Sequence, residues 1–478
     1  MIDVAIIGCG VIGAAAAFEL SKYQASVVIL EKENDIAMGA TRANSAIIHA
    51  GYDPKPGTLM ARLNVQGNAM TEQLCRDLDV PFSRIGSFVL AFSAQEAKTV
   101  QTLYERGVQN GVPGLQVLSG DEVRQMDPLV SPEVVCALYA PSAGIITPWE
   151  YALALAETAV RNGAELRRST RVTGISKIEG GYRIETNREP VEARYVINAA
   201  GVYSDQIHDM VAPHAFTVIP SKGEYYVMDK SECYRARHVL FQCPNEAGKG
   251  VLITPTMDHN LLVGPNAENV DEPQHPSNTA RGMAFVREKA ARTMPSLTYR
   301  AAIRNFAGIR ANTDIGDFQI SIAAEHFIDL AGIKSPGLSS APAIALEAVK
   351  LLKECGFAPE KKEHPVTTRR KKRFRFMSEE ERKAAVSENP LYGRVICRCE
   401  TVTEGEIVDA IHSPIPPCSV DGVKRRAGSG MGRCQGGFCG PRVVDILSRE
   451  LGISPLCVLQ DGEGSFILME ETKKEAQA

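Results

Sequence analysis

The stretch DVAIIGCGVIGAAAAFELSK, residues 3–22, decides the fold of this chain. Residues 3–7 form a short apolar run typical of a buried β-strand, and an alanine-rich helical segment follows the glycines. Gly8 permits a tight turn, Gly10 lets the backbone approach a bound group, and Gly13 lets the helix pack close to the strand. The stretch therefore predicts a strand, a glycine turn and a helix in direct succession.

A second apolar run, SVVILEK at residues 26–32, follows this helix and places Glu31 18 residues after Gly13. An acidic residue at that position can accept hydrogen bonds from an adenosine ribose, and the helix N-terminus can hold a pyrophosphate. The whole pattern predicts a βαβ unit that binds a dinucleotide. The residues expected at the dinucleotide are Gly8, Gly10, Val11, Ile12, Gly13, Glu31 and Lys32.

The bulk composition is that of an ordinary globular protein. The 478 residues suffice for two or three domains, and the net charge of −4 gives no sign of nucleic-acid binding. No apolar run reaches the length of a membrane span, and the N-terminus lacks a basic leader. We therefore expect a cytoplasmic protein with no direct membrane span and with mostly reduced or metal-bound cysteines. Membrane association through a partner stays open.

The segment GATRANSAIIHAGYDPKPGT, residues 39–58, is rich in small and hydroxyl side chains. Such a loop can lie along an extended FAD, with Thr41, Asn44 and Ser45 near the phosphates or the ring, whereas a plain surface loop is the alternative. No second GxGxxG follows a strand, and GSGMG at residues 428–432 has the wrong spacing. One dinucleotide is therefore expected, rather than FAD together with NAD.

Four cysteines near the end of the chain form two close pairs, Cys397-x-Cys399 and Cys434-x4-Cys439. Thiolates at such spacings, in glycine-rich or turn-like context, are typical of a metal centre. Ligand type alone leaves structural zinc and a [2Fe–2S] cluster open. A cluster is favoured, because a flavin that takes up two electrons benefits from a one-electron exit.

Residues 356–392 are expected to be a linker with a charged helix. They contain the basic run TTRRKKRFRF, which we interpret as solvated linker rather than a nucleic-acid site, given the overall acidic balance. Beyond it, Thr403 with Glu406 three residues later predicts a capped helix start.

Four stretches resemble the D-amino-acid oxidase-like superfamily of FAD-dependent flavoproteins, in the order in which that superfamily has them. They are the 39–58 loop, YVINAAGVYSD (195–205), FAGIRANTDIGDFQI (306–320) and LAGIKSPGLSSAPAIALEAV (330–349). The resemblance implies an α/β fold with a Rossmann-like FAD-binding domain. It also implies FAD contacts from further residues, namely Val172, Ala200, Gly201, Gly337, Leu338 and Ser339.

Within the superfamily, the whole chain resembles the FAD-dependent subunit of anaerobic glycerol-3-phosphate dehydrogenase, in particular its shorter bacterial homologues. These carry a carboxy-terminal [2Fe–2S] domain like bacterioferritin-associated ferredoxin, and the motifs include KGEYYVMD and GVKRRAGSGMGRCQGGFCGPRV. The matching cluster ligands are Cys397, Cys399, Cys434 and Cys439. The amino-terminal half also resembles L-2-hydroxyglutarate dehydrogenase, so the substrate is not decided by the resemblance.

The resemblance and the β-rich stretches between the motifs together predict the domain organisation. An FAD-dependent oxidoreductase spans 1–355, with FAD segments at about 1–75, 146–214 and 301–355. A mixed or antiparallel substrate domain is inserted at about 76–145 and 215–300. The linker 356–392, a small helical [2Fe–2S] domain at 393–460 and a tail at 461–478 complete the chain.

The expected function is an FAD-dependent dehydrogenase that oxidises sn-glycerol 3-phosphate to dihydroxyacetone phosphate. Electrons would pass from the flavin through the cluster to an electron-accepting partner protein, of which a second flavoprotein subunit is one form. The alternatives are an L-2-hydroxy acid or amino-acid dehydrogenase, and a non-catalytic electron-transfer flavoprotein subunit.

This chemistry needs a base and a cation for a small anionic substrate. His49 is the expected proton-transfer group, with a histidine that merely packs in the core or against FAD as the alternative. Arg310 is expected at the phosphate or carboxylate, because a guanidinium binds such groups bidentately. Lys222 and Tyr225, on a strand expected to face the flavin, are further substrate-binding candidates.

Overall fold

The computed structural model describes residues 1–244, 250–273 and 276–471. The predicted substrate segment 215–300 and the predicted tail 461–478 each include residues outside this description. The chain divides into two compact units, one formed by residues 1–30 and 37–369 and the other by residues 31–36 and 370 onward. The segment expected to be a linker, 356–392, is thus shared between the units.

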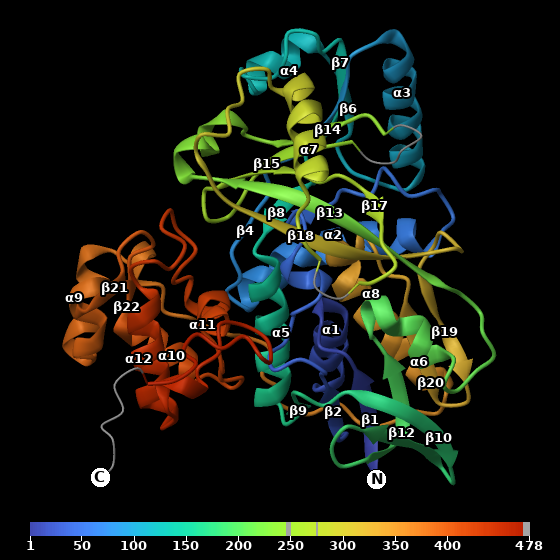
Figure 1. The fold of residues 1–478 in the computed structure, drawn as a ribbon. Coiled ribbons are helices and arrows are strands. Elements are labelled where there is room, and N and C mark those ends of the chain that lie inside the picture. Colours follow the sequence, from blue (N-terminus) through green and yellow to red (C-terminus); the bar gives the residue numbers. More distant parts are fainter. Residues whose placement is uncertain (245–249, 274–275, 472–478) are drawn as a thin grey trace. The chain divides into compact units, whose positions relative to one another are not determined.

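The first sheet of the first unit has a parallel centre in the order β20-β12-β1-β2-β9 (Figure 1). A hairpin of β10 and β11 extends the first half of β12, and β19 pairs with β20, both antiparallel. The strands are β1 (Ile2–Ile7), β2 (Val27–Leu30), β9 (Glu165–Arg167), β10 (Val172–Ile178), β11 (Gly181–Thr186), β12 (Val191–Asn198), β19 (Gln319–Ala324) and β20 (Phe327–Ala331).

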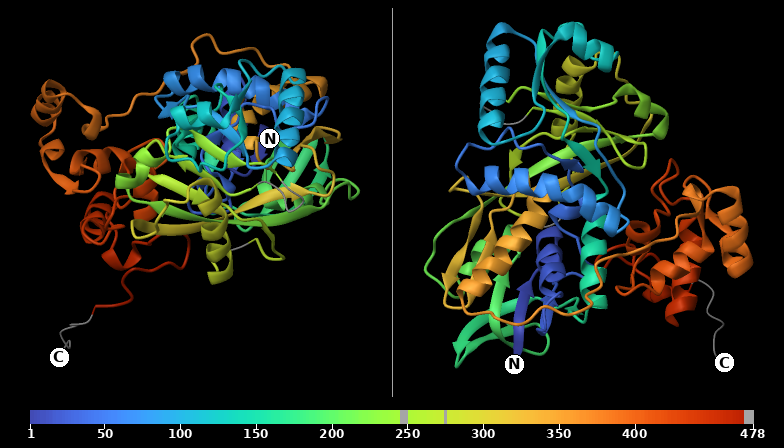
Figure 2. Two further views of the ribbon diagram at one scale, coloured as in Figure 1. Left: turned by 90° about the horizontal axis from the view of Figure 1, so that it is seen from above. Right: turned by 180° about the vertical axis from the view of Figure 1, so that it is seen from behind.

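Helix α1 (Val11–Leu20) packs between α5 (Pro148–Arg161) and α8 (Gly337–Glu354). Its sequence is apolar on all sides, which suits a helix buried between a sheet and two neighbouring helices. Helix α2 (Leu59–Asp77) crosses close to α8, and it lies at mid-height in the first unit in both drawings (Figures 1 and 2). The βαβ unit predicted from the glycine motif is confirmed.

The second sheet of the first unit is mixed, since β14 and β5 are parallel and the other pairs antiparallel. Its order is β17-β13-β16-β15-β14-β5-β7-β6, with β18 also paired to β13. The strands are β5 (Ser87–Ala91), β6 (Gln116–Ser119), β7 (Cys136–Ala140), β13 (Val218–Met228), β14 (Val239–Gln242), β15 (Leu252–Pro255), β16 (Leu261–Gly264), β17 (Glu268–Asn269) and β18 (Ala302–Thr313).

Alternation along β5 shows how this sheet is covered on both faces. Val89 packs with Leu103 of α3 (Ala94–Gln109), whereas Phe88 packs with Val286 of α7 (Ala280–Thr293). Helix α4 (Gly120–Met126) contacts β6 and β7. A small sheet of β3 (Ile47–Ile48), β8 (Gly144–Ile146) and β4 (Phe82–Ser83) completes the strands of this unit. The expected mixed sheet is confirmed.

The second unit is largely helical. It contains α9 (Glu379–Glu388), a hairpin of β21 (Val395–Cys397) and β22 (Val402–Thr403), α10 (Glu404–Ile411), α11 (Val420–Ala427) and α12 (Gly440–Leu451). The predicted cap of α10 is present: the Thr403 hydroxyl accepts from the Glu406 N–H, and the Glu406 carboxylate accepts from the Thr403 N–H. Cys397 and Cys439 belong to the apolar core of this unit.

Asp35 belongs to the second unit and is fully buried within it. Its two carboxylate oxygens accept hydrogen bonds from Arg425 and Arg426, all at 2.8 Å. Burial opposes the charged carboxylate, yet Arg426 and Arg425 bring the pKa of Asp35 far below its usual range. The short segment Glu31–Ile36 is therefore fixed to the helical unit by a buried ion pair.

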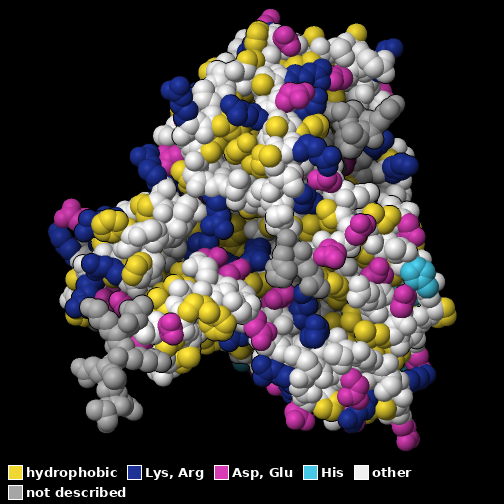
Figure 3. All heavy atoms as spheres, in the orientation of Figure 1, with side chains coloured by type: hydrophobic (Ala, Val, Ile, Leu, Met, Phe, Trp, Pro, Cys, Tyr) yellow, Lys and Arg dark blue, Asp and Glu magenta, His cyan; other side chains and the backbone are white. Residues whose placement is uncertain are grey.

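None of the helices in the described residues combines the length and apolar character needed to cross a bilayer. On the face drawn in Figure 3, cationic and anionic side chains are interspersed. This mixture agrees with the small net charge of −4.

Candidate functional site

The glycine turn after β1 is built for close contact with the turn that follows β12. Gly8 has φ +98°, and a Cβ there would lie 2.6 Å from the Ala199 carbonyl oxygen. A Cβ on Gly13 would lie 2.0 Å from the Gly8 carbonyl oxygen. Both positions therefore require glycine. Beside them, Gly201 has φ +61° and open space where its Cβ would stand. The predicted residues Ala200 and Gly201 thus lie next to the N-terminus of α1.

The loop after β2 also reaches this helix terminus. The Val11 N–H donates to the Thr41 hydroxyl at 3.0 Å, which places Thr41 at the first turn of α1. Asn44 uses its side chain to close the loop, since it donates to the Ala40 and Thr41 carbonyls and accepts from the Ala46 N–H. Thr41 is therefore placed for a phosphate, whereas Asn44 shapes the loop that carries it.

The acidic residue that follows β2 is buried. Glu31 is 7% exposed and accepts from the Glu33 N–H at 3.0 Å. Lys32 pairs with Glu33 at 2.6 Å on the surface. Val172 opens β10 and is half-buried. Of these residues, Glu31 alone directly follows β2, the position at which the sequence predicted a ribose ligand.

His49 is held through its backbone and its ring. Its N–H donates to the Ser339 hydroxyl at 2.7 Å, and its carbonyl accepts from the amides of Asn64 and Asn68. Its Nε2 lies 3.0 Å from the Ser335 hydroxyl. The ring also stacks on Phe241 at 5.7 Å between centroids. His49 is therefore a half-buried side chain with a fixed orientation, and one of its ring nitrogens is hydrogen-bonded to a serine hydroxyl.

The N-terminus of α8 meets this histidine through Ser339, which is fully buried. Helix α2 comes so close that a Cβ on Gly67 would lie 2.1 Å from the Ser339 carbonyl oxygen. Leu338, next to it, is half-buried. Gly337 starts the helix without a side-chain cap. Ser339 is thus a link between α8 and His49.

Tyr225 and Arg310 lie on the same face of the second sheet. Tyr225 is paired with Phe306, and their rings stack with centroids 4.6 Å apart. Arg310 is paired with Ser221, four residues before Tyr225 on β13, and residues an even number apart share a face. The Tyr225 hydroxyl lies 3.1 Å from the Ser45 hydroxyl. This face of the sheet therefore contacts the loop of residues 39–58, which also contains His49.

Two neighbours set the direction of the Arg310 guanidinium. Its Nη atoms donate to the Asn266 carbonyl at 3.4 and 3.5 Å. It also lies across Gly223, where a Cβ would stand 2.6 Å from Nη2. The Asn266 amide is in turn fixed by the buried Glu224, because it donates to that carboxylate at 2.7 Å. The cation is thus placed by contacts that leave most of its donors for a ligand.

Lys222 does not join this face. Alternation along β13 directs it with Glu224 to the opposite side, where its Nζ lies 3.4 Å from Glu268 and 3.3 Å from the Ser277 carbonyl. The lysine is 6% exposed. The structure therefore separates Lys222 from Arg310 and Tyr225, with which sequence reasoning had grouped it.

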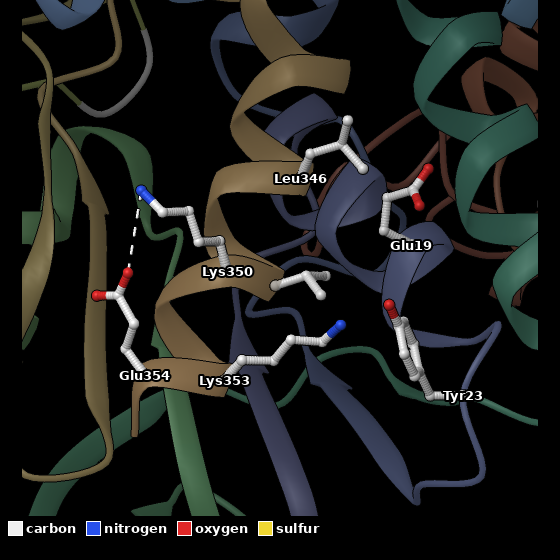
Figure 4. Close-up of a pocket in the computed structure, with 7 residues that line it drawn as sticks. Glu19, Tyr23, Leu346, Lys350, Lys353 and Glu354 are labelled. Carbon is white, nitrogen blue, oxygen red and sulfur yellow. Dashed lines mark ion pairs between the residues drawn. The ribbon is translucent and has the colours of Figure 1, made fainter. Parts of the chain in front are cut away.

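A hollow of about 550 Å³ lies elsewhere in the first unit, between α1 and α8 (Figure 4). Its labelled lining residues come from the end of α1 and the turn after it, and from the second half of α8, away from the glycine turn and Ser339. Lys350 and Glu354 pair there at 3.9 Å. None of the predicted site residues lines this hollow.

In the second unit, the four cysteines lie as two close pairs. The Cys399 and Cys434 sulfurs are 3.5 Å apart, and Cys397 is hydrogen-bonded to Cys439. Among the described residues, no three His, Cys, Asp or Glu side chains already have a metal-binding arrangement. A metal centre that is bound by all four cysteines would have one pair of sulfurs as ligands on one side and the other pair on the other side.

Backbone donors surround these sulfurs. The Cys439 side chain lowers the pKa of Cys397 to about 6, and N–H groups of Gly430 and Glu400 act in the same direction. Cys434 has a lowered pKa because the Phe438 backbone bonds to it. The other thiol of each pair, Cys439 or Cys399, has a raised pKa, so one thiol in each pair is the more readily ionised. Four cysteine sulfurs with N–H donors aimed at them are what an iron–sulfur cluster requires. The donor set therefore fits the expected cluster.

Comparison with known proteins decides the family. Residues 3–351 match the FAD dependent oxidoreductase (DAO) family, and residues 395–449 match the BFD-like [2Fe-2S] binding domain. This chain belongs to the FAD dependent oxidoreductase family. Its cofactors are FAD and a [2Fe–2S] cluster, so the resemblance noted in the sequence is confirmed, and zinc is not the metal supported.

Three relatives of this flavoprotein bear on its function. It is 51% identical to glycerol 3-phosphate dehydrogenase from Caloramator mitchellensis, with both chains covered in full. The solved L-alpha-glycerophosphate oxidase from Mycoplasma pneumoniae with FAD bound has a TM-score of 0.73 and 33% identity, over 77% of this chain and 98% of that one. Human mitochondrial L-2-hydroxyglutarate dehydrogenase is 31% identical over 55% of this chain and 60% of its own length.

The FAD site fits the residues of the first unit. Glycines without Cβ atoms, a helix N-terminus and the Thr41 hydroxyl form a cradle for phosphates. Sequence reasoning did not single out Ser335, Phe241, Asn266 or the two asparagines of α2. These residues contact His49 or Arg310 across long sequence separations, so no local pattern could have indicated them.

Proposed function

We propose that the protein is a dehydrogenase that oxidises sn-glycerol 3-phosphate to dihydroxyacetone phosphate. The observation that carries this proposal is the 51% identity to a glycerol 3-phosphate dehydrogenase along the entire chain, including the cysteine module. We further propose that the electrons leave through the cluster to a partner protein, and that the protein works in the cytoplasm.

In this proposal Arg310 binds the substrate phosphate. Its guanidinium is a permanent cation on β18, and its orientation by Asn266 leaves a bidentate face for an oxyanion. The hydroxyls of Ser45 and Tyr225, 3.1 Å apart on the same side, add neutral hydrogen bonds to a polyol. Lys222 has no part in this binding, because it is engaged with acidic groups on the other face.

His49 takes the hydroxyl proton of the substrate in this scheme. When bound, FAD accepts the two electrons of the oxidation, and the [2Fe–2S] cluster passes them on singly. The chain contributes an imidazole whose Nε2 is held at 3.0 Å from the Ser335 hydroxyl, so that the ring keeps one orientation. The stacked Phe241 limits rotation further and excludes water from one side of the ring.

The similarity to L-2-hydroxyglutarate dehydrogenase favours an L-2-hydroxy acid dehydrogenase as the second candidate. Arg310 could bind a carboxylate in the same way as a phosphate. An electron-transfer subunit without its own substrate is the candidate of another class. Both differ from the main proposal in which small molecule reduces the flavin.

Anaerobic titration separates the three candidates. Glycerol 3-phosphate, L-2-hydroxyglutarate and a panel of amino acids are added separately, and the visible flavin bands are recorded. We expect glycerol 3-phosphate to bleach the flavin. Bleaching only by L-2-hydroxyglutarate would select the second candidate, and bleaching by none of the small molecules would select the electron-transfer subunit.

A further inference from the structure

The two cysteine pairs differ in their access to solvent. Cys397 and Cys439 are each 1% exposed, whereas Cys399 and Cys434 are exposed. Because the exposed sulfurs lie 3.5 Å apart, they form a single edge of the cysteine module. A cluster bound by all four cysteines would be buried on the side of Cys397 and Cys439. It would be accessible to solvent on the side of Cys399 and Cys434.

The exposed charges of the two segments that carry this edge are cationic. Segments 394–400 and 431–442 carry the four cysteines, and Glu400, the acidic residue within them, is buried and paired with Arg375 at 2.9 Å. The next acidic residue, Asp445, follows on α12. The exposed charged side chains of the two segments are Arg394, Arg398, Arg433 and Arg442, of which Arg394 is paired with Glu404 at 3.1 Å.

An aromatic side chain stands in the same place. Phe438 is 65% exposed, which is unusual for a large apolar ring, and the Arg398 guanidinium lies 5.3 Å from its centroid. Exposed aromatic and arginine side chains are typical of the centres of protein interfaces. The contact also shows that the two cysteine-bearing segments present one continuous surface.

We infer that the edge formed by Cys399, Cys434, Arg398, Arg433 and Phe438 is the docking surface for an acidic one-electron carrier protein. The inference rests on the proposed exit of electrons through the cluster. Complementary charge accelerates encounter and fixes orientation, and the exposed sulfur edge brings the cluster within reach of the carrier. Each substrate oxidised supplies two electrons, so two carrier encounters are needed, one electron being taken each time, and two protons go to solvent.

The test is direct binding of a flavodoxin, used as an acidic carrier, to the oxidised holoenzyme at low and high salt. The double variant Arg398→Glu/Arg433→Glu reverses the charge of the edge. Lys383→Glu is the matched control, because Lys383 is 73% exposed on α9 and pairs with Glu379. We expect the double variant to weaken binding by about tenfold or more at low salt, with little change in the control. Salt should weaken wild-type binding and leave the double variant nearly unaffected.

A small cationic acceptor, hexaammineruthenium(III), provides the second readout. The double variant should reoxidise faster than the wild type with this acceptor, whereas substrate bleaching of its flavin should be unchanged. Equal flavodoxin binding by wild type and double variant would overturn the inference. The inference would also be overturned if the flavin of the double variant bleached normally but its own cluster were no longer reduced. That result would mean that the two arginines act in electron transfer within the protein and not in docking of a carrier. Binding is measured without substrate, so it reports on the surface even if the proposed substrate is wrong.

Discussion

At the scale of single residues, His49 and Arg310 are the two groups on which the proposed chemistry depends, and each is oriented by neighbours remote in sequence. The Ser335 hydroxyl on His49 lies 286 positions away along the chain, and the Asn266 carbonyl on Arg310 lies 44 positions away. The sequence could predict the two residues from their motifs. It could not predict their partners, because only the folded chain brings those segments together.

Replacing His49 by alanine tests its role in proton transfer. We expect His49→Ala to lower kcat by roughly 100-fold, because a positioned base contributes about that much or more. Flavin content should be unchanged, since the Ser339 contact of position 49 is made by the backbone N–H. Stopped-flow bleaching and the flavin absorbance of the purified variant check both points. If His49→Ala turned over at the wild-type rate, His49 would have only a packing role.

Replacing Gly223 by alanine tests the placement of Arg310. The new Cβ would lie 2.6 Å from Nη2 of Arg310 and 2.8 Å from Cβ of Pro265, and the flexible guanidinium is the group that can move away. We expect the KM for the anionic substrate to rise about tenfold or more, with a smaller change in kcat, because a charge-assisted bond is weakened. Gly174→Ala in β10 is the control, since its Cβ meets nothing closer than 3.9 Å. A wild-type KM for Gly223→Ala would remove Arg310 from substrate binding.

At the scale of elements, local patterns predicted what local physics determines. The glycine turn, the apolar strands β1 and β2 and the capping box at Thr403 are confirmed, because each depends on residues within a few positions of one another. The face of β13 that carries Tyr225 depends on its register with β18, which the sequence does not contain. Lys222, by contrast, lies three positions before Tyr225 on β13, so alternation along the strand alone puts the two on opposite faces, and the sequence interpretation overlooked this.

The buried ion pair of Asp35 is the first test at this scale. We expect Asp35→Ala to destabilise the second unit by about 3–5 kcal/mol, because the buried Arg426 would lose its carboxylate partner and Arg425 would keep only its ion pair with Asp461. Lys383→Ala removes an exposed ion pair and should change stability by less than about 1 kcal/mol. Denaturant unfolding followed by hydrogen exchange in residues 395–450 measures both. Equal stability of the two variants would contradict this account of the pair.

His208 links α6 (Ser204–His208) to β20 and gives the first unit a pH dependence. Burial lowers its pKa, but bonds to the Asp329 carboxylate and the Pro213 carbonyl outweigh this and raise it above its usual value near 6.5. Burial also raises the pKa of Asp329, against its bonds from Asn198 and His208.

A raised His208 pKa gives stability that is complete below about pH 6.5 and is lost as pH rises through the folded-state value. We expect the unfolding midpoint of the wild type to fall from pH 6 to pH 9 more than that of His208→Gln, which cannot titrate. Parallel profiles of the two proteins across that range would show that His208 makes no such contribution.

At the scale of the whole molecule, the chain combines two chemistries that the sequence placed at its two ends. A two-electron site in the FAD-binding unit and a one-electron centre in the cysteine unit are both supported by the family matches. Composition and spacing could predict both centres, since their motifs are contiguous. The substrate could not be predicted in this way. The expected substrate-binding groups are an arginine and hydroxyls, and these bind a phosphate as well as a carboxylate.

Rapid anaerobic mixing of the holoenzyme with glycerol 3-phosphate tests the central claim most directly. Flavin absorbance and the cluster signal are followed together, in the wild type and in Cys434→Ser. We predict that in the wild type the flavin bleaches first and the cluster is then reduced, while Cys434→Ser bleaches at the wild-type rate but transfers no electrons onward. A flavin that stays oxidised with glycerol 3-phosphate, or a Cys434→Ser variant that passes electrons normally, would contradict the account.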